Sequence, residues 1–314
     1  TSWQCQEMNY YKTNPEMTYK NYLEKNGYTT KSIPTYLKAQ NQFREWCVSY
    51  GTTVETIDYK TFLKYIEHLR NPRGERSRTI KPRTLKTYVC NLKIYFDYLV
   101  ALGFRVENSI QKIDIKGVKK EVIHNILSSD ELEDLYQSYN TTKGNLLARK
   151  RNKIMLGLLV YQGLTTQNLQ QLQVENVQLY KGKIDILGTK KSNGRQLELK
   201  PWQLMELMEY INEVRPRILE QTNKETEQLF LPLGTSLKLQ NSLSKITKEL
   251  KKINHKFIDV KQIRTSVIVN WLKQHNLRKV QYLAGHRYIS STERYQQDDL
   301  ENLHKTINTF HPFS

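Results

Sequence analysis

The stretch that decides how this chain is interpreted reads Leu283-Ala284-Gly285-His286-Arg287-Tyr288-Ile289-Ser290-Ser291-Thr292-Glu293-Arg294-Tyr295. An apolar helix end runs into Gly285, which suits a helix terminus, and a polar turn follows. His286 and Tyr295 together offer a proton carrier and a nucleophile. Because the chain contains 20 tyrosines, this spacing gains meaning only from the residues upstream of it.

Length and charge narrow the class of protein. The 314 residues are enough for two domains of ordinary size. The formal net charge of +18 predicts a polyanionic partner, with nucleic acid ahead of an anionic membrane surface. The sequence contains no run of about 18 apolar residues, so we expect no membrane-spanning helix. Nucleic acid is therefore the class of partner that the composition favours.

Neither the cysteines nor the histidines are arranged for a metal. Cys5, Cys47 and Cys90 are widely separated and odd in number, which favours reduced thiols. The seven histidines do not cluster, so we expect no metal and no other cofactor. Residues 1–12 lack the apolar core of a secretory signal. We interpret them as an N-terminal extension, and we expect a protein of the bacterial cytoplasm or nucleoid.

Residues 13–115 carry the apolar spacing of a small helical bundle. The clearest helix has apolar side chains at steps of three or four residues, with Pro34 in its first turn and Gly51 at its end. None of these helices is long enough to be stable alone, so they must pack on one another. The other predicted helices cover residues 62–69, 85–102 and, as a short segment, 17–23.

A basic loop separates two of these helices. Residues 70–83 hold six cations, two prolines and a glycine in fourteen positions, which is typical of an exposed segment. The loop leads into a helix N-terminus, where backbone N–H groups add donors for an anion. Contacts with the DNA backbone are predicted for Arg73, Arg76, Arg78, Lys81 and Arg83.

The chain changes character after residue 108, where lysines alternate with isolated apolar residues. We interpret residues 116–127 as an extended linker between two domains. The second domain, residues 128–314, opens with Ser128-Ser129-Asp130-Glu131, which is a capping-box pattern in front of a helix.

The second domain combines helices with one short β segment. A helix over residues 146–161 begins with cations, of which Arg149 and Arg151 are predicted to bind DNA. The β signal is confined to about residues 177–199, where two alternating runs flank the turn Ser192-Asn193-Gly194. Helical spacing then resumes. The predicted fold is mainly α, with an N-terminal helical bundle and a C-terminal, mostly α domain that contains a small antiparallel β-sheet.

Several short segments follow one another over residues 150–300. In chain order they are Gly163-Leu164-Thr165-Thr166-Gln167-Asn168-Leu169, the hairpin residues Lys190 and Lys191, Lys261-Gln262-Ile263-Arg264, Leu283 to His286, and Tyr295. In that order they resemble Gly-Leu-Arg-x-x-Glu-Leu, the β-hairpin lysine, His-x-Leu-Arg, Leu-Gly-His and the nucleophile of the tyrosine recombinase, or phage integrase, family. The N-terminal bundle resembles the DNA-binding domain of that family in pattern and position only.

The resemblance implies a catalytic domain that breaks and rejoins DNA without metal or ATP. Tyr295 would attack the phosphodiester and form a 3′-phosphotyrosine, which stores the bond energy for rejoining. Arg264 would offer a planar fork to the phosphorane, and His286 would donate to the same oxygens or manage the tyrosine proton. A hairpin lysine, either Lys190 or Lys191, would protonate the leaving 5′ oxygen.

Two segments depart from the family pattern. Thr165 stands in place of the first arginine, with Asn168 where an acid is usual, and Lys261 replaces a histidine. Loss of one preorganised donor typically slows such a reaction by about a hundredfold or more. The permanent charge of Lys261 is one compensation. The other cations that we expect to be able to reach the phosphate are Arg149, Arg151 and Lys153.

We therefore interpret the chain as a site-specific DNA recombinase, namely the integrase or transposase of a mobile element. By resemblance, the tail after Tyr295 would dock on a neighbouring subunit, giving dimers to tetramers on DNA; a self-packed helix is the alternative. We also consider a second recombinase or an accessory DNA-bending protein as partners. The departures at Thr165 and Lys261 support one alternative function, a catalytically impaired, recombinase-like DNA-binding or architectural subunit that acts with an active partner.

Overall fold

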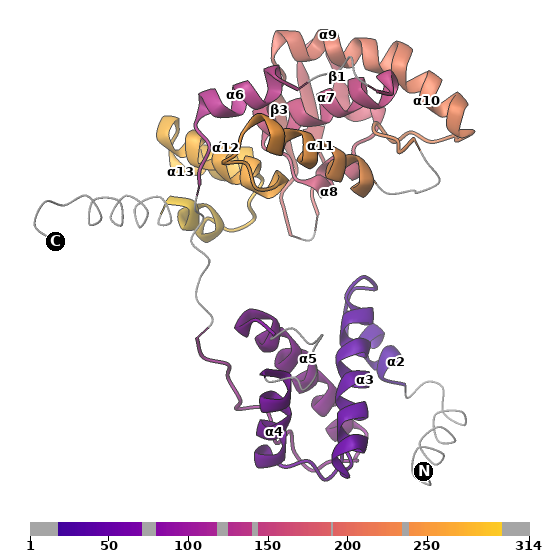
Figure 1. Ribbon diagram of the computed structural model, residues 1–314, viewed down its shortest axis with the longest axis vertical. Coiled ribbons are helices and arrows are strands. Elements are labelled where there is room, and N and C mark those ends of the chain that lie inside the picture. The colour runs from indigo at the N-terminus through magenta and orange to yellow at the C-terminus, as the bar shows by residue number, and fades with distance from the viewer. Residues whose placement is uncertain are drawn as a thin grey trace, which may run out of the picture. The chain divides into compact units, whose positions relative to one another are not determined.

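The computed structural model describes residues 18–70, 80–117, 125–139, 144–189, 191–233 and 239–296. The chain divides into two compact units, Thr1–Lys120 and Glu121–Ser314 (Figure 1). Both units are built mainly from helices, and the C-terminal unit also contains the single small antiparallel sheet of the described residues, so the predicted fold class is confirmed. The predicted N-terminal extension and the tail after residue 296 lie outside the described residues.

The helices of the N-terminal unit begin and end where the sequence signals them. Pro34 stands in the first turn of its helix, and Gly51 closes that helix with a left-handed φ of 75°. Phe43, Phe62 and Phe96 are completely buried and pack their rings at tilted or edge-on angles. The helices are α2 (Tyr19–Lys25), α3 (Ile33–Tyr50), α4 (Tyr59–Arg70) and α5 (Pro82–Ala101).

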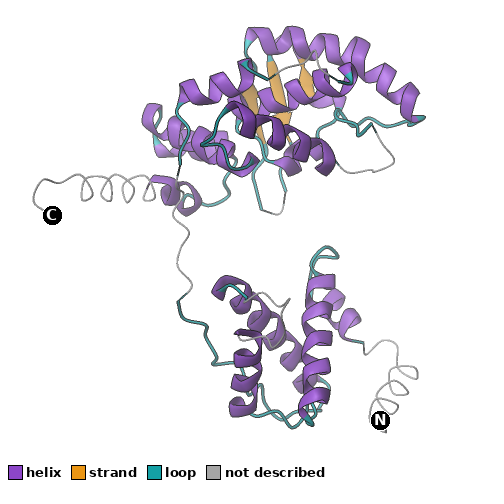
Figure 2. Cartoon of the chain, viewed as in Figure 1, coloured by secondary structure: helices purple, strands orange, loops and turns teal. Residues whose placement is uncertain are grey.

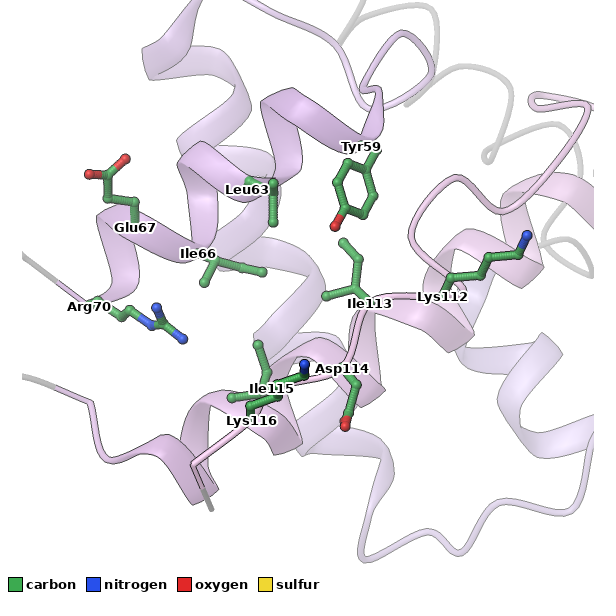
Figure 3. A pocket seen from close by; sticks show the side chains of 10 residues that line it. All are labelled: Tyr59, Leu63, Ile66, Glu67, Arg70, Lys112, Ile113, Asp114, Ile115 and Lys116. Carbon is green, nitrogen blue, oxygen red and sulfur yellow. The ribbon is translucent and has the colours of Figure 1, made fainter. Parts of the chain in front are cut away.

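The segment after residue 108 is more closely packed than its sequence suggests. Ile110, Ile113 and Ile115 are all buried in the core of the N-terminal unit. Figure 3 shows Ile113 and Ile115 lining one pocket together with Ile66 of α4. The isolated apolar residues of this segment are therefore core contacts that extend the first unit, although their spacing fits neither a helix nor a strand.

The C-terminal unit contains one three-stranded sheet among its described residues. The strands are antiparallel in the order β1-β2-β3, and Figure 2 shows them side by side among the helices of this unit. Ile184 pairs with Leu197, and Ile186 pairs with Arg195. The strands are β1 (Val177–Gln178), β2 (Lys183–Ile186) and β3 (Arg195–Glu198), with short 3₁₀ turns at η2 (Val174–Asn176) and η3 (Leu179–Lys181).

Helices surround this sheet and supply most of the core. The predicted capping box is confirmed, because Ser128 accepts a hydrogen bond from the backbone of Glu131 and Glu131 bonds back to the backbone of Ser128. The chain over residues 290–296 is also helical. The helices are α6 (Ser129–Gln137), α7 (Leu146–Gln162), α8 (Thr166–Gln171), α9 (Pro201–Glu209), the π-helical turn η4 (Tyr210–Val214), α10 (Arg215–Thr222), α11 (Gln240–Ile253), α12 (Val260–Gln274) and α13 (Leu277–Ala284).

The second unit begins earlier in the chain than the predicted boundary at residue 128. Leu127, which the sequence pattern places in the linker, is completely buried in the core of the C-terminal unit. Its backbone N–H donates to Ser266 Oγ at 2.9 Å, and its carbonyl accepts from Asn270 Nδ2. A residue with both backbone groups bonded to α12 belongs to the packed unit rather than to the linker.

The predicted DNA contact of Arg151 is wrong. Its side chain is only 2% exposed and lies inside the C-terminal unit. The guanidinium donates to the carbonyl of Leu231 at 2.5 Å and to Ser242 Oγ at 2.8 Å. Nearly every face of α7 is buried from Arg151 onward. The side chain of Arg151 therefore lies inside the unit, where it binds the backbone of the loop at Leu231.

We predict that Arg151→Met lowers the free energy of unfolding by about 2 to 4 kcal/mol, because it leaves a buried carbonyl and a buried hydroxyl without their donor. DNA affinity of the folded variant should not change. Urea unfolding and fluorescence anisotropy on duplex DNA measure the two quantities. Arg217→Met, at an exposed position of α10, is the control and should leave stability nearly unaltered. A stable variant with weakened DNA binding would contradict the structural role.

Candidate DNA-cleavage site

Three side chains that the sequence singled out meet at one place in the C-terminal unit. Arg264 lies on α12, His286 follows the end of α13, and Tyr295 lies in the helical segment 290–296. The Nη2 atom of Arg264 is 3.5 Å from Nε2 of His286. The rings of His286 and Tyr295 stack, with centroids 5.7 Å apart and planes 12° apart.

Arg264 is held by two backbone carbonyls. Its Nη1 donates to the oxygen of Gly163 at 2.5 Å, and its Nη2 donates to the oxygen of Ala284 at 2.7 Å. Gly163 caps the end of α7, and Ala284 is the last residue of α13. Carbonyls at helix C-termini lack helical partners and carry partial negative charge, so both suit a guanidinium. The arginine is therefore fixed in place before any substrate arrives.

His286 is neutral in the free protein. Burial, followed by the nearby charges of Arg264 and Arg195, lowers the pKa of His286 to about 4. An arginine N–H can only donate, so Nε2 accepts at this contact and the proton resides on Nδ1, which lies 2.9 Å from Thr292 Oγ1. The arginine contact therefore assigns the tautomer, and the hydroxyl of Thr292 accepts from Nδ1.

The hairpin that carries the lysines docks beside the histidine. The backbone N–H of Asn193 donates to the oxygen of Gly285 at 3.0 Å, and Ser192 pairs with His286 as an isolated antiparallel bridge. Lys191 is exposed at this turn. Lys190 lies outside the described residues. The backbone of this hairpin therefore adjoins the segment that carries His286.

Thr165 and Asn168 bind each other instead of a phosphate. The hydroxyl of Thr165 accepts from the N–H of Asn168 at 3.0 Å, and Asn168 Oδ1 accepts from the N–H of Thr165 at 3.1 Å. This reciprocal pair is the capping box of α8. The two departures from the family pattern are thus one local structural unit. Lys261, in the first turn of α12, is exposed one helical turn before Arg264.

The cations that we expected to replace the missing arginine bind elsewhere. Arg149 pairs with Glu249 at 3.9 Å and lies over the ring of Tyr139. Lys153 donates to the carbonyl of Tyr136 and lies 3.7 Å from the centroid of the Tyr136 ring. Together with the buried Arg151, they are engaged within the unit, and none of these contacts involves Arg264, His286 or Tyr295. The DNA contact of Arg149 stays a prediction.

Sequence reasoning missed Arg195. It is the first residue of β3, is only 6% exposed, and packs directly on Gly285, where an added Cβ would lie 2.3 Å from Nη1. The signal was present in the alternation of β3, where Arg195 and Leu197 share the buried face. A cation at an inward-facing position of a strand is unusual, and this one could have been found on that ground.

The N-terminal unit carries a second cluster of cations and hydroxyls. Lys81 occupies the N-cap position of α5 and makes no side-chain capping bond, and Arg83 follows in the first turn; both are exposed. A pocket beside this turn is lined by cationic and hydroxyl side chains that suit phosphate oxygens, namely Lys38, Arg83, Thr35, Thr84 and Thr87. The other cations predicted for this loop, Arg73, Arg76 and Arg78, lie outside the described residues.

We predict that His286 makes the folded protein less stable as the pH falls. Between pH 6.5 and 4 the unfolded chain takes up a proton that the buried ring does not, so stability is present above 6.5 and lost toward 4. Allowing for partial exposure, the loss is about 2 kcal/mol. Urea unfolding across this range should show it in the wild type and not in His286→Gln. The control His275→Gln, at an exposed ring, should behave as wild type. Equal profiles for all three proteins would contradict the assignment.

No helix in the described part of the chain is long and apolar enough to cross a membrane.

Comparison with known proteins gives a consistent result. The sequence model of the Phage integrase family matches residues 125–302, which is more than half of the chain. The tyrosine recombinase XerD of Staphylococcus epidermidis is 26% identical over 300 residues, covering 94% of this chain and 97% of its own.

Two solved structures share the fold. XerH recombinase bound to palindromic difH, a post-cleavage complex, has a TM-score of 0.66 at 23% identity, covering 88% of this chain and 78% of its own. A lambda integrase tetramer bound to a Holliday junction has a TM-score of 0.58 at 16% identity, covering 88% and 74%. The predicted family is confirmed: this chain belongs to the phage integrase family of tyrosine recombinases, whose members break and rejoin DNA.

Proposed function

We propose that this chain is the integrase or transposase of a mobile element and that Tyr295 is its nucleophile. The observation that carries the proposal is the convergence of Arg264, His286 and Tyr295 at one place, from three separate segments. Metal-free cleavage of a phosphodiester needs a nucleophile, cations for the non-bridging oxygens and an acid for the leaving oxygen. The site and the adjoining lysine hairpin contain all three.

The proposed reaction balances without a cofactor. The phenolic oxygen of Tyr295 forms a bond to phosphorus while the bond from phosphorus to the 5′ oxygen breaks. The tyrosine proton passes to the neutral Nε2 of His286, and the imidazolium then donates to a non-bridging oxygen. Arg264 neutralises the charge on the phosphorane. The hairpin lysine, Lys190 or Lys191, protonates the leaving 5′ oxygen, and reversal of these steps rejoins the strand.

We infer that the binding partner is duplex DNA and that subunits associate on it. The XerH structure is a complex with DNA, and the lambda integrase structure is a tetramer on a junction. The net charge of +18 and the cluster around Arg83 suit the phosphate backbone. Lys81 and Arg83 would hold one stretch of backbone, and Lys261 would add charge near the cleaved linkage. We place such an enzyme with the chromosome, in the bacterial cytoplasm or nucleoid. A second recombinase or a DNA-bending protein remains a proposed partner.

The nucleophile can be tested on a library of target sites. Wild type is incubated with nicked duplexes whose flanking sequences are randomised, and SDS-resistant adducts are isolated and sequenced. On the sequence recovered, Tyr295→Phe should form no adduct because it lacks the attacking oxygen. Tyr288→Phe is the matched control, at an exposed tyrosine seven residues before Tyr295, and should retain adduct formation. Tight duplex binding without any wild-type adduct would instead support the architectural subunit.

The contact proposed for Arg83 has a separate test. Arg83→Gln should weaken binding to all duplex sequences and lower the slope of log affinity against log salt by about one, because one fewer phosphate is neutralised. Anisotropy titrations between low and moderate salt measure this slope. Lys60→Gln changes an exposed cation in the first turn of α4 and is the control. An unchanged slope for Arg83→Gln, or an equal change in both variants, would remove Arg83 from the interface.

A further inference from the structure

The site contains a buried cation to which the family pattern assigns no role. Arg195 is only 6% exposed, and its Nε and Nη2 atoms have no hydrogen-bond partner among the described residues. Unsatisfied buried donors are rare, because each one loses its bond to water without replacement. Packing alone therefore does not explain a buried guanidinium with two unsatisfied donors.

Two other buried arginines of the same unit have a structural role, and their hydrogen bonds can be compared with those of Arg195. Arg151 donates to the carbonyl of Leu231, and Arg215 donates to the carbonyls of Gln228 and Thr226. Each binds loop backbone, and each has acceptors placed for it. Arg195 differs from both, since Nε and Nη2 have no such acceptor in the described part of the chain.

The surroundings of Arg195 lack an anion in the part of the chain that the structure describes. Burial and the nearby charge of Arg264 lower its pKa to about 10, and among the described residues only Tyr282 acts in the other direction. Arg264 itself is bound by neutral carbonyls. Two guanidiniums and a neutral imidazole therefore share one site. A phosphodiester carries the single negative charge and the oxygen acceptors that this arrangement is missing.

The backbone ties Arg195 to the reacting groups. Gly285 accommodates the guanidinium directly against its α-carbon and is the neighbour of His286. Asn193, two residues before Arg195, donates to the carbonyl of Gly285, so the hairpin and the histidine segment are joined. The position of the missing family arginine, Thr165, lies two residues after Gly163, whose carbonyl holds Arg264.

We propose that Arg195 is the second phosphate-binding arginine of this site, and that from β3 it supplies the charge that Thr165 cannot. This inference rests on the proposed function, since the ligand is the phosphodiester that Tyr295 attacks. Nε and Nη2 donate to a non-bridging oxygen. Both donors then have an acceptor, and the negative charge of the phosphate lies between the two guanidiniums. The role is catalytic because the donors touch the reacting phosphate.

The first test needs no DNA site. Arg195→Met removes an unsatisfied buried cation that faces a second cation, so its unfolding midpoint should rise above wild type. Inorganic phosphate, added at constant ionic strength, should raise the midpoint of wild type more than that of the variant. Arg215→Met is the matched control and should lower the midpoint while leaving the phosphate effect intact. An Arg195→Met protein that is destabilised like the control, with an undiminished phosphate effect, would overturn the inference.

The second test uses adduct formation on the nicked duplex that wild type selects. Arg195→Met should form adduct about a hundredfold more slowly than wild type. When a neutral methylphosphonate replaces the cleaved phosphate, no charge needs balancing, and most of this defect should disappear. An equal defect on both substrates would show that Arg195 acts only through the structure. Absence of adduct from wild type would refute the proposed nucleophile, and the phosphate test would then decide the role of Arg195 alone.

Discussion

The site depends on one buried interaction, the guanidinium of Arg264 between the carbonyl ends of two helices. Gly163 closes α7 and Ala284 closes α13, and each presents an oxygen that has no helical partner. The arginine satisfies both, and their partial negative charge holds it without a carboxylate. Three helices are thereby joined at the point where the histidine and the tyrosine approach.

Glycine makes this close approach feasible. Gly163 has a φ of 57°, and an added Cβ would lie 3.1 Å from Val267 of α12 and 3.2 Å from Trp271. Gly285 has a φ of 67° and leaves no room for a side chain because Arg195 packs on it. Both residues stand in segments that resemble the family motifs. Their function is steric, since they let a helix end, a hairpin and two guanidiniums come together.

The charges of the site are unbalanced in the free protein. Arg264 lies close enough to lower the pKa of the buried Arg195, and burial, with the charges of both arginines, lowers the pKa of His286 and keeps its imidazole neutral. In the part of the chain that the structure describes, these fixed donors have no anion beside them. Such an arrangement is unfavourable for folding and favourable for binding a phosphate. Such preorganisation is what metal-free phosphoryl transfer requires. If Arg195 binds the phosphate as proposed, Thr165 can cap α8 without leaving the site short of cations.

The sequence by itself determined the helices, the paired strands of the hairpin and the order of the residues proposed to react. These features are encoded locally, by apolar spacing around Phe43, by the capping box at Ser128 and by the alternating runs that form β2 and β3. The tight turn itself lies between Thr189 and Ser192, not at the predicted Ser192-Asn193-Gly194. Only the tertiary structure decided which cations are buried and what they bind. Arg151 meets Leu231 and Ser242 from 80 and 91 residues away, whereas Arg195 meets Gly285, a comparable distance along the chain. Charge is visible in a sequence, but burial and pairing depend on segments that meet only after folding.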